Sequence, residues 1–179
     1  VAGLAGGALA DDEQLGRAAS DPAQIAAIVA GMDAADVPDF AGQVMQAAAR
    51  MPLSPRVRLQ QMQAVSQAFL KAVPPDRLDA ALAQLILNVP FQMMPEWVGG
   101  FKPALAEQTA AMDDAAYDKL AAGVLKRIDA DETLPAEDKT IFATFAIVLM
   151  ARGKSGGADE AFAGRMLPVL PAAYRDQVA

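Results

Sequence analysis

The chain of 179 residues contains no cysteine and no histidine. Without cysteine it has no disulfides, no thiol nucleophile and no thiolate metal site. Without histidine it lacks the commonest general base and the commonest zinc ligand, and a Ser-His-acid triad cannot be assembled. These absences argue against most hydrolases and zinc enzymes. We therefore expect a non-catalytic protein with no cofactor and no bound metal.

Aromatic residues and long apolar runs are also scarce. Aromatic residues make up 6% of the chain, whereas 54% of all residues are hydrophobic and alanine is abundant. A core of Ala, Leu, Val, Ile and Met suits closely packed helices better than sheets. The most hydrophobic stretch, Ile141 to Ala151, is shorter than the roughly 18 residues needed to cross a bilayer. The composition therefore predicts an all-α fold without a transmembrane segment.

Positive charge is in deficit. The chain has 15 Lys and Arg residues against 22 Asp and Glu residues, which gives a net charge of -7. Its densest basic cluster is only Arg50, Arg56 and Arg58, whereas nucleic-acid binding proteins carry a basic stripe or patch. We expect no nucleic-acid partner.

The first residues have the composition of a processed leader. Residues 1–10 are small and apolar and end in Ala8-Leu9-Ala10 before Asp11, which is typical of a secretory signal and its small-x-small cleavage site. We interpret residues 1–10 as a signal-peptide remnant or an apolar leader, and residues 11–179 as a single all-α domain with a flexible joint at 153–157. Export to the periplasm is the predicted localisation, with the cytoplasm as the alternative.

Prolines mark most of the expected helix starts. A proline is tolerated in the first turn of a helix, and several of the prolines here follow a polar residue that can cap the helix. The expected starts lie near Pro22, Pro38, Pro55, Pro75, Pro103, Asp113, Pro135, Ala158 and Pro171. The helix that begins at Pro135 is the most apolar, and we expect it to lie at the centre of the fold.

The helix starts recur with a period. Second helices of the expected pairs begin near Pro55, Pro95, Pro135 and Pro171, and first helices begin near Pro38, Pro75, Asp113 and Ala158. The spacing of about 40 residues is the length of one helical hairpin in a solenoid array. We predict a single domain of about eight to ten short helices, either a helical bundle or an irregular α-solenoid of helical hairpins.

One segment concentrates large apolar side chains beside a glycine pair. Pro95 and Gly99-Gly100 interrupt it, so we expect a short helical turn and a bend, with helix resuming at Pro103. Its large side chains are Phe91, Met93, Met94, Trp97 and Phe101. Flexible apolar side chains in a loop suit adaptable binding, which makes these residues the candidate partner-binding site. The alternative is that they fill the core, as large aromatic residues usually do.

Three functions remain compatible with these patterns. The first is a non-catalytic helical interaction or scaffold domain with a protein partner, since helical surfaces offer grooves and no reactive group is evident. The second is a carrier of a lipid or another apolar small molecule, enclosed by Met-rich and Ala-rich helices. The third is a carboxylate-dependent hydrolase, which needs two acidic groups facing each other across a cleft. Most acidic clusters lie near expected helix starts, where the helix dipole alone explains them.

Overall fold

Helices make up nearly all of the regular structure. The computed structural model describes residues 11–152 and 158–178, and within these residues it contains ten α-helices and no strand. The α-helices are α1 (Asp12–Ser20), α2 (Ile25–Ala30), α3 (Val37–Ala49), α4 (Pro55–Ala72), α5 (Leu78–Leu87), α6 (Met94–Gln108), α7 (Asp114–Ala130), α8 (Ala136–Met150), α9 (Ala158–Met166) and α10 (Ala172–Val178). Short 3-10 turns are η1 (Pro22–Gln24), η2 (Pro75–Arg77), η3 (Phe91–Met93) and η4 (Leu167–Val169). The predicted all-α class is confirmed.

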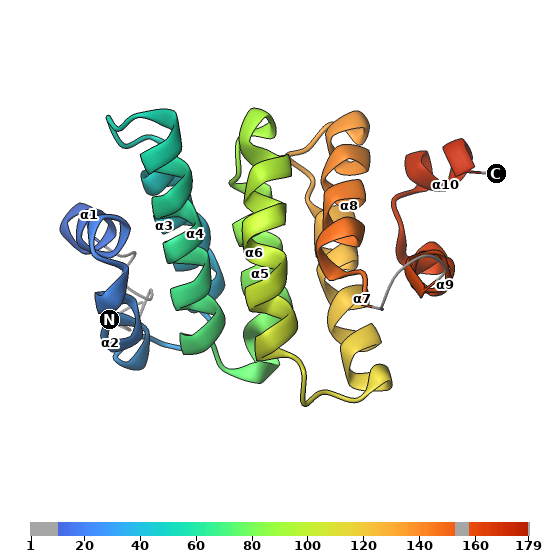
Figure 1. The fold of residues 1–179 in the computed structure, drawn as a ribbon, viewed down its shortest axis with the longest axis horizontal. Coiled ribbons are helices and arrows are strands. Elements are labelled where there is room, and N and C mark those ends of the chain that lie inside the picture. Colours follow the sequence, from blue (N-terminus) through green and yellow to red (C-terminus); the bar gives the residue numbers. More distant parts are fainter. Residues whose placement is uncertain (1–10, 153–157, 179) are drawn as a thin grey trace, which may run out of the picture.

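The helices are stacked as pairs in two layers (Figure 1). Helices α1, α3, α5, α7 and α9 pack on one another in that order and form one layer, and α2, α4, α6, α8 and α10 form the other. Within the stack α3 packs on α4 and α7 packs on α8, and each pair of consecutive helices lies beside the next pair along the chain. This arrangement is the stack of helical hairpins that the period of about 40 residues predicts.

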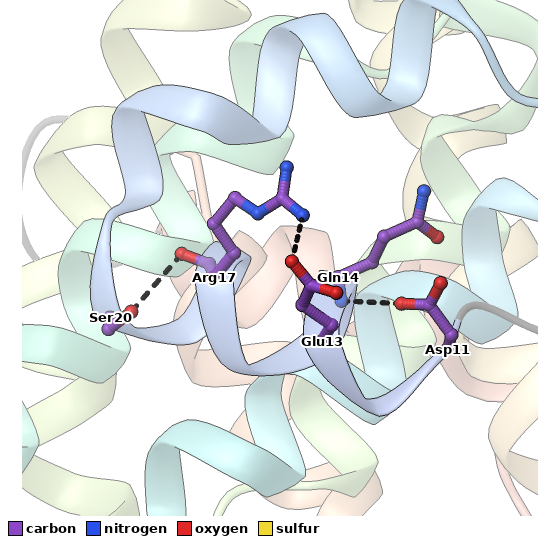
Figure 2. A network of polar contacts seen from close by, with 5 residues as sticks. All are labelled: Asp11, Glu13, Gln14, Arg17 and Ser20. Carbon is purple, nitrogen blue, oxygen red and sulfur yellow. Dashed lines mark hydrogen bonds and ion pairs between the residues drawn. The ribbon is translucent and has the colours of Figure 1, made fainter.

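The first helix begins at a side-chain cap (Figure 2). The carboxylate of Asp11 accepts a hydrogen bond of 2.7 Å from the backbone N–H of Gln14, which satisfies one of the free donors at the start of α1. One turn apart, Arg17 and Glu13 form an ion pair of 3.1 Å along the exposed side of the helix. No helix was predicted before Pro22, although Asp11 and the acidic first turn are signals for one.

The same capping geometry begins two longer helices. The hydroxyl of Ser54 accepts a bond of 3.4 Å from the N–H of Val57 at the start of α4, and the carboxylate of Asp113 accepts one of 2.7 Å from the N–H of Ala116 at the start of α7. Both starts were predicted from the sequence, and both predictions are confirmed.

The prediction of a bend between Phe91 and Phe101 is wrong. Helix α6 continues from Met94 through Gly99, Gly100 and Pro103 to Gln108. Pro95 lies in its first turn, where proline is tolerated, and glycine lowers helix propensity without preventing helix formation. Pro103 removes the N–H that would bond to the carbonyl of Gly99, and its ring crowds that carbonyl, but packing of the buried face outweighs this cost.

The central helix is α5, and the prediction that α8 occupies this place is wrong. Seven of the ten residues of α5 are buried, and the helix packs against α3 on one side and α7 on the other. Helix α8 lies one pair further along, and its Ile141 and Val148 side chains are 39% and 48% exposed. An apolar sequence therefore marks α8 as helical, but its position in the stack determines how much of it is covered.

Two predictions concern residues outside the described part of the chain. These are the leader at 1–10, with its consequence for export, and the flexible joint at 153–157. Both stay predictions.

Candidate binding groove

The side chains of the predicted partner-binding segment divide into two groups. Met94, Trp97 and Phe101 are fully buried, whereas Phe91 is 40% exposed and Met93 is half-buried. The three buried side chains lie in the core of this fold, and a partner-binding role for the segment stays a prediction. The alternative interpretation, that they fill the core, describes their position.

The buried tryptophan is held by specific contacts between α4 and α6. Its ring stacks on Phe101 with 5.0 Å between the ring centroids and 24° between the planes. Its Nε1–H donates a hydrogen bond of 3.0 Å to the hydroxyl oxygen of Ser66, and that hydroxyl donates one of 2.8 Å to the carbonyl of Met62. Because each polar atom of this cluster has a partner, it needs no ligand.

Phe91 packs against the fold with only part of its surface. Its ring lies 4.9 Å from that of Phe142 on α8, measured between centroids. Phe91 and Met93 are the residues of the predicted patch whose side chains have exposed surface. An isolated exposed aromatic side chain is normal on a protein surface.

A charged groove crosses the first helices of three consecutive hairpins. Its volume is about 360 Å³. Its lining comes from the start of α3, from α5 with the preceding turn, and from the end of α7: Ala35, Pro38, Asp39, Arg77, Ala80, Ala83, Gln84, Leu87, Arg127, Ala130 and Asp131. None of these residues was predicted as a site residue. They come from three separate parts of the sequence, and only the stacking of α3, α5 and α7 brings these parts together.

Small residues create the hollow. Ala80 and Ala83 are buried on α5, and Ala35 and Ala130 lie exposed on its two sides. A longer side chain at any of these positions would occupy part of the groove. The alanine content that favours close helix packing therefore also leaves room on the surface of this layer.

Two glycines bring the neighbouring helices close to α5. A Cβ atom on Gly42 of α3 would lie 2.7 Å from Oε1 of Gln84, and one on Gly123 of α7 would lie 2.5 Å from Oδ2 of Asp79. Both distances are shorter than van der Waals contact. Glycine at these positions lets α3 and α7 approach the polar side chains of α5 from opposite sides.

The charged side chains of the groove differ in whether they already have an ion-pair or hydrogen-bond partner. Nε of Arg127 lies 3.3 Å from Oδ2 of Asp79, which is an ion pair at the edge of the groove. The carboxylate of Asp131 accepts a bond of 2.8 Å from the N–H of Thr133. Nε of Arg77, in contrast, is buried and has no hydrogen-bond partner among the described residues. Its nearest carboxylate, that of Asp76, lies 4.0 Å away. An unpaired buried N–H costs about 1–3 kcal/mol. The Arg77 side chain as a whole is 43% exposed and lines the groove, so a ligand can reach its outer end.

A second arginine cluster joins helices at the far end of the stack. Nη2 of Arg152 donates to the carbonyls of Thr109 at 3.3 Å and Met112 at 2.9 Å, and its guanidinium lies 4.6 Å from the centre of the Tyr117 ring. The Tyr117 hydroxyl donates a bond of 2.7 Å to the carbonyl of Met150. Burial raises the pKa of Tyr117 to about 12, an effect that the nearby positive charge of Arg152 opposes. These contacts fix the end of α8 against the loop before α7, which is a structural role.

Acidic residues elsewhere in the described part of the chain mostly lie apart from the groove. Among the described residues, no three Asp or Glu side chains come close enough together to hold a metal ion. Asp11 and Asp113 serve as helix caps, which agrees with the helix-dipole explanation of the acidic clusters. The only carboxylates that line the groove are Asp39 and Asp131, on α3 and at the end of α7.

The chain finds no match among known proteins when it is compared with models of protein families, with curated proteins and with solved structures. Within the part of the chain that the structure describes, no helix has both the length and the apolar character to cross a membrane. The fold and the groove therefore define the class: an all-α stack of helical hairpins with a charged groove across three of its helices. Function has to be inferred from that groove.

Proposed function

We propose that this protein is a non-catalytic helical interaction domain that binds a protein partner through the groove over α3, α5 and α7. The observation that carries this proposal is the groove itself, because it spans three hairpins and presents charges of both signs from a small-residue surface. Grooves between helices bind segments of other proteins, and sites for small molecules are mostly apolar, whereas this groove is lined by charged side chains.

The alternatives have less support. A carrier of apolar ligands needs an enclosed apolar cavity, but the groove is open to solvent and lined by charged side chains. A carboxylate-dependent hydrolase needs an acid and a base facing each other across a cleft, but the two carboxylates in the groove lining come from the start of α3 and the end of α7, on either side of α5.

Site-specific cross-linking in cells that express the protein tests the proposal. A photoreactive amino acid replaces Ala130, which is exposed in the groove, or Ala106, which is exposed on α6 in the other layer. We expect a discrete cross-linked product from position 130 and none of the same mass from position 106. Equal products from both positions, or none from position 130, would contradict the proposal.

Charge substitutions supply the matched control. The double variant Arg77→Gln/Arg127→Gln removes two positive charges from the groove, and Arg50→Gln/Arg56→Gln removes two from exposed positions outside its lining. Only the first variant should lose the product at position 130. Loss in both variants would indicate a general effect of net charge rather than binding in the groove.

A further inference from the structure

Arg77 presents the exposed part of its guanidinium side chain to the groove. Its Nε is buried without a hydrogen-bond partner among the described residues, while its side chain as a whole is 43% exposed and lines the groove. The two Nη groups at the outer end of a guanidinium can bind a carboxylate through two parallel hydrogen bonds, which are short and strong because both partners are charged. The ligand group that suits this side chain is an anion with planar oxygens.

The neighbouring charges limit how negative the ligand can be. Asp76 lies beside Arg77, and Asp79 forms an ion pair with Nε of Arg127. Asp39 and Asp131 line the groove on α3 and after α7, on either side of α5. Four carboxylates near two arginines repel a dianion such as a phosphate monoester more strongly than a single carboxylate. The same aspartates favour positive charge on both sides of the ligand's carboxylate.

The length of the groove suits a short extended segment. Packed helices lie about 8–10 Å apart, so a path from α3 across α5 to α7 covers roughly 16–20 Å. An extended chain advances about 3.3 Å per residue and spans this path with about five or six residues.

We infer that the groove takes an extended peptide segment that presents one carboxylate to Arg77 and basic side chains to Asp39 and Asp131. This inference rests on the proposed function, because it names the kind of segment that the partner supplies. The exposed side chain of Arg77 in the groove lining and the placement of aspartates on both sides of α5 carry it.

Titration with defined peptides tests the inference. The probe is the acetylated and amidated heptapeptide Ala-Lys-Ala-Glu-Ala-Lys-Ala, and its control carries Gln in place of Glu, which has the same shape without the charge. Side-chain Nε–H signals of the ¹⁵N-arginine-labelled protein report binding, and the Arg77 signal is identified by its loss in Arg77→Gln. We expect the Glu peptide to shift this signal and to bind about ten-fold or more tightly than the Gln peptide.

Two protein variants and a competing ligand complete the test. Arg77→Gln should bind the two peptides equally, whereas Arg56→Gln should keep the preference for Glu. Equal affinity of both peptides for the unmodified protein, with the Arg77 signal shifted, would overturn the carboxylate inference and leave the proposed function standing. Shifts produced by inorganic phosphate but not by the Glu peptide would also overturn it, in favour of a phosphate ligand. If neither peptide shifts the Arg77 signal and the cross-link at position 130 is also absent, the inference and the proposed function both fail.

Discussion

The packed interior around Trp97 and the groove around Arg77 differ in whether their polar atoms have hydrogen-bond partners. In the interior, the indole N–H of Trp97 bonds to Ser66, whose own hydroxyl proton bonds to Met62, so no polar atom of the cluster lacks a partner. In the groove, Nε of Arg77 has none among the described residues, and 43% of the Arg77 side chain is exposed. A ligand can reach charged side chains that are exposed in the groove, whereas the paired polar atoms of the interior only hold the fold together. Trp97 and Phe101 belong to the interior, and single charged residues on alanine-rich helices line the groove.

The largest effect is expected from Trp97→Ala. The side chain is fully buried against Phe101, and removing it leaves a cavity that the surrounding helices cannot fill. The free energy of unfolding should fall by about 3–5 kcal/mol, as measured by urea denaturation followed by circular dichroism. Phe91→Ala is the control from the same segment, and it should cost much less because Phe91 is 40% exposed. Similar losses in the two variants would break the distinction between interior and surface within this segment.

Ser66→Ala tests whether the interior depends on its hydrogen bonds as well as on packing. The substitution removes little volume but leaves the Trp97 N–H buried without an acceptor. The free energy of unfolding should fall by about 1–3 kcal/mol. Trp97 is the only tryptophan in the chain, so its fluorescence reports the same site directly. Ser20→Ala, which removes an exposed hydroxyl bonded to the carbonyl of Gly16, should stay within about 0.5 kcal/mol of the unmodified protein.

Local sequence patterns predicted the helices well because the determinants of helix starts are local. Ser54 and Asp113 cap helices through bonds to N–H groups three residues ahead, and these spacings can be read without a structure. The failure at α6 has a different origin. Pro95, Gly99 and Gly100 are signals for a break, but burial of Trp97 and its neighbours stabilises the continuous helix, and that packing is not visible in a local window.

The groove could not be predicted in the same way. Asp39, Arg77 and Arg127 are far apart in the sequence, and no motif connects them. The period of about 40 residues was the available signal, since it places the first helices of successive hairpins side by side. It does not show which residues of those helices face outward over small neighbours. Apolar concentration around Trp97 was the more visible pattern, and it marked the core.

Tyr117→Phe extends the comparison to a second buried aromatic residue. At neutral pH the variant loses the hydroxyl bond to Met150, at a cost of about 1 kcal/mol. Burial raises the pKa of Tyr117 from 10.0 to about 12 in the folded protein, so its neutral form is favoured by folding. The stability that the folded protein gains from neutral Tyr117 is fully present below pH 10 and is lost as the pH rises from about 10 through 12.

The pH-dependent contribution of Tyr117 to stability can be measured by comparing the unmodified protein with Tyr117→Phe. The gap in unfolding free energy between the unmodified protein and Tyr117→Phe should shrink between pH 10 and 12. Tyr174→Phe leaves Tyr117 as the only tyrosine, so tyrosinate absorbance then reports its titration alone. A gap that stays constant over this range, or titration of Tyr117 near pH 10, would contradict burial as the cause of the raised pKa.

The smallest effect on stability is expected in the groove. Arg127→Gln breaks the ion pair with Asp79, in which the two side chains are 49% and 28% exposed. Solvent screens such a pair, so the free energy of unfolding should change by less than about 1 kcal/mol, and less still in high salt. Arg127→Gln/Asp79→Asn removes both charges and should be no less stable than the single variant, because neither charge is then left unpaired. If Arg127→Gln instead costs as much as Ser66→Ala, the groove charges hold the fold together as the interior does. A small stability change together with loss of the cross-link at position 130 would place Arg127 among the groups kept for a partner.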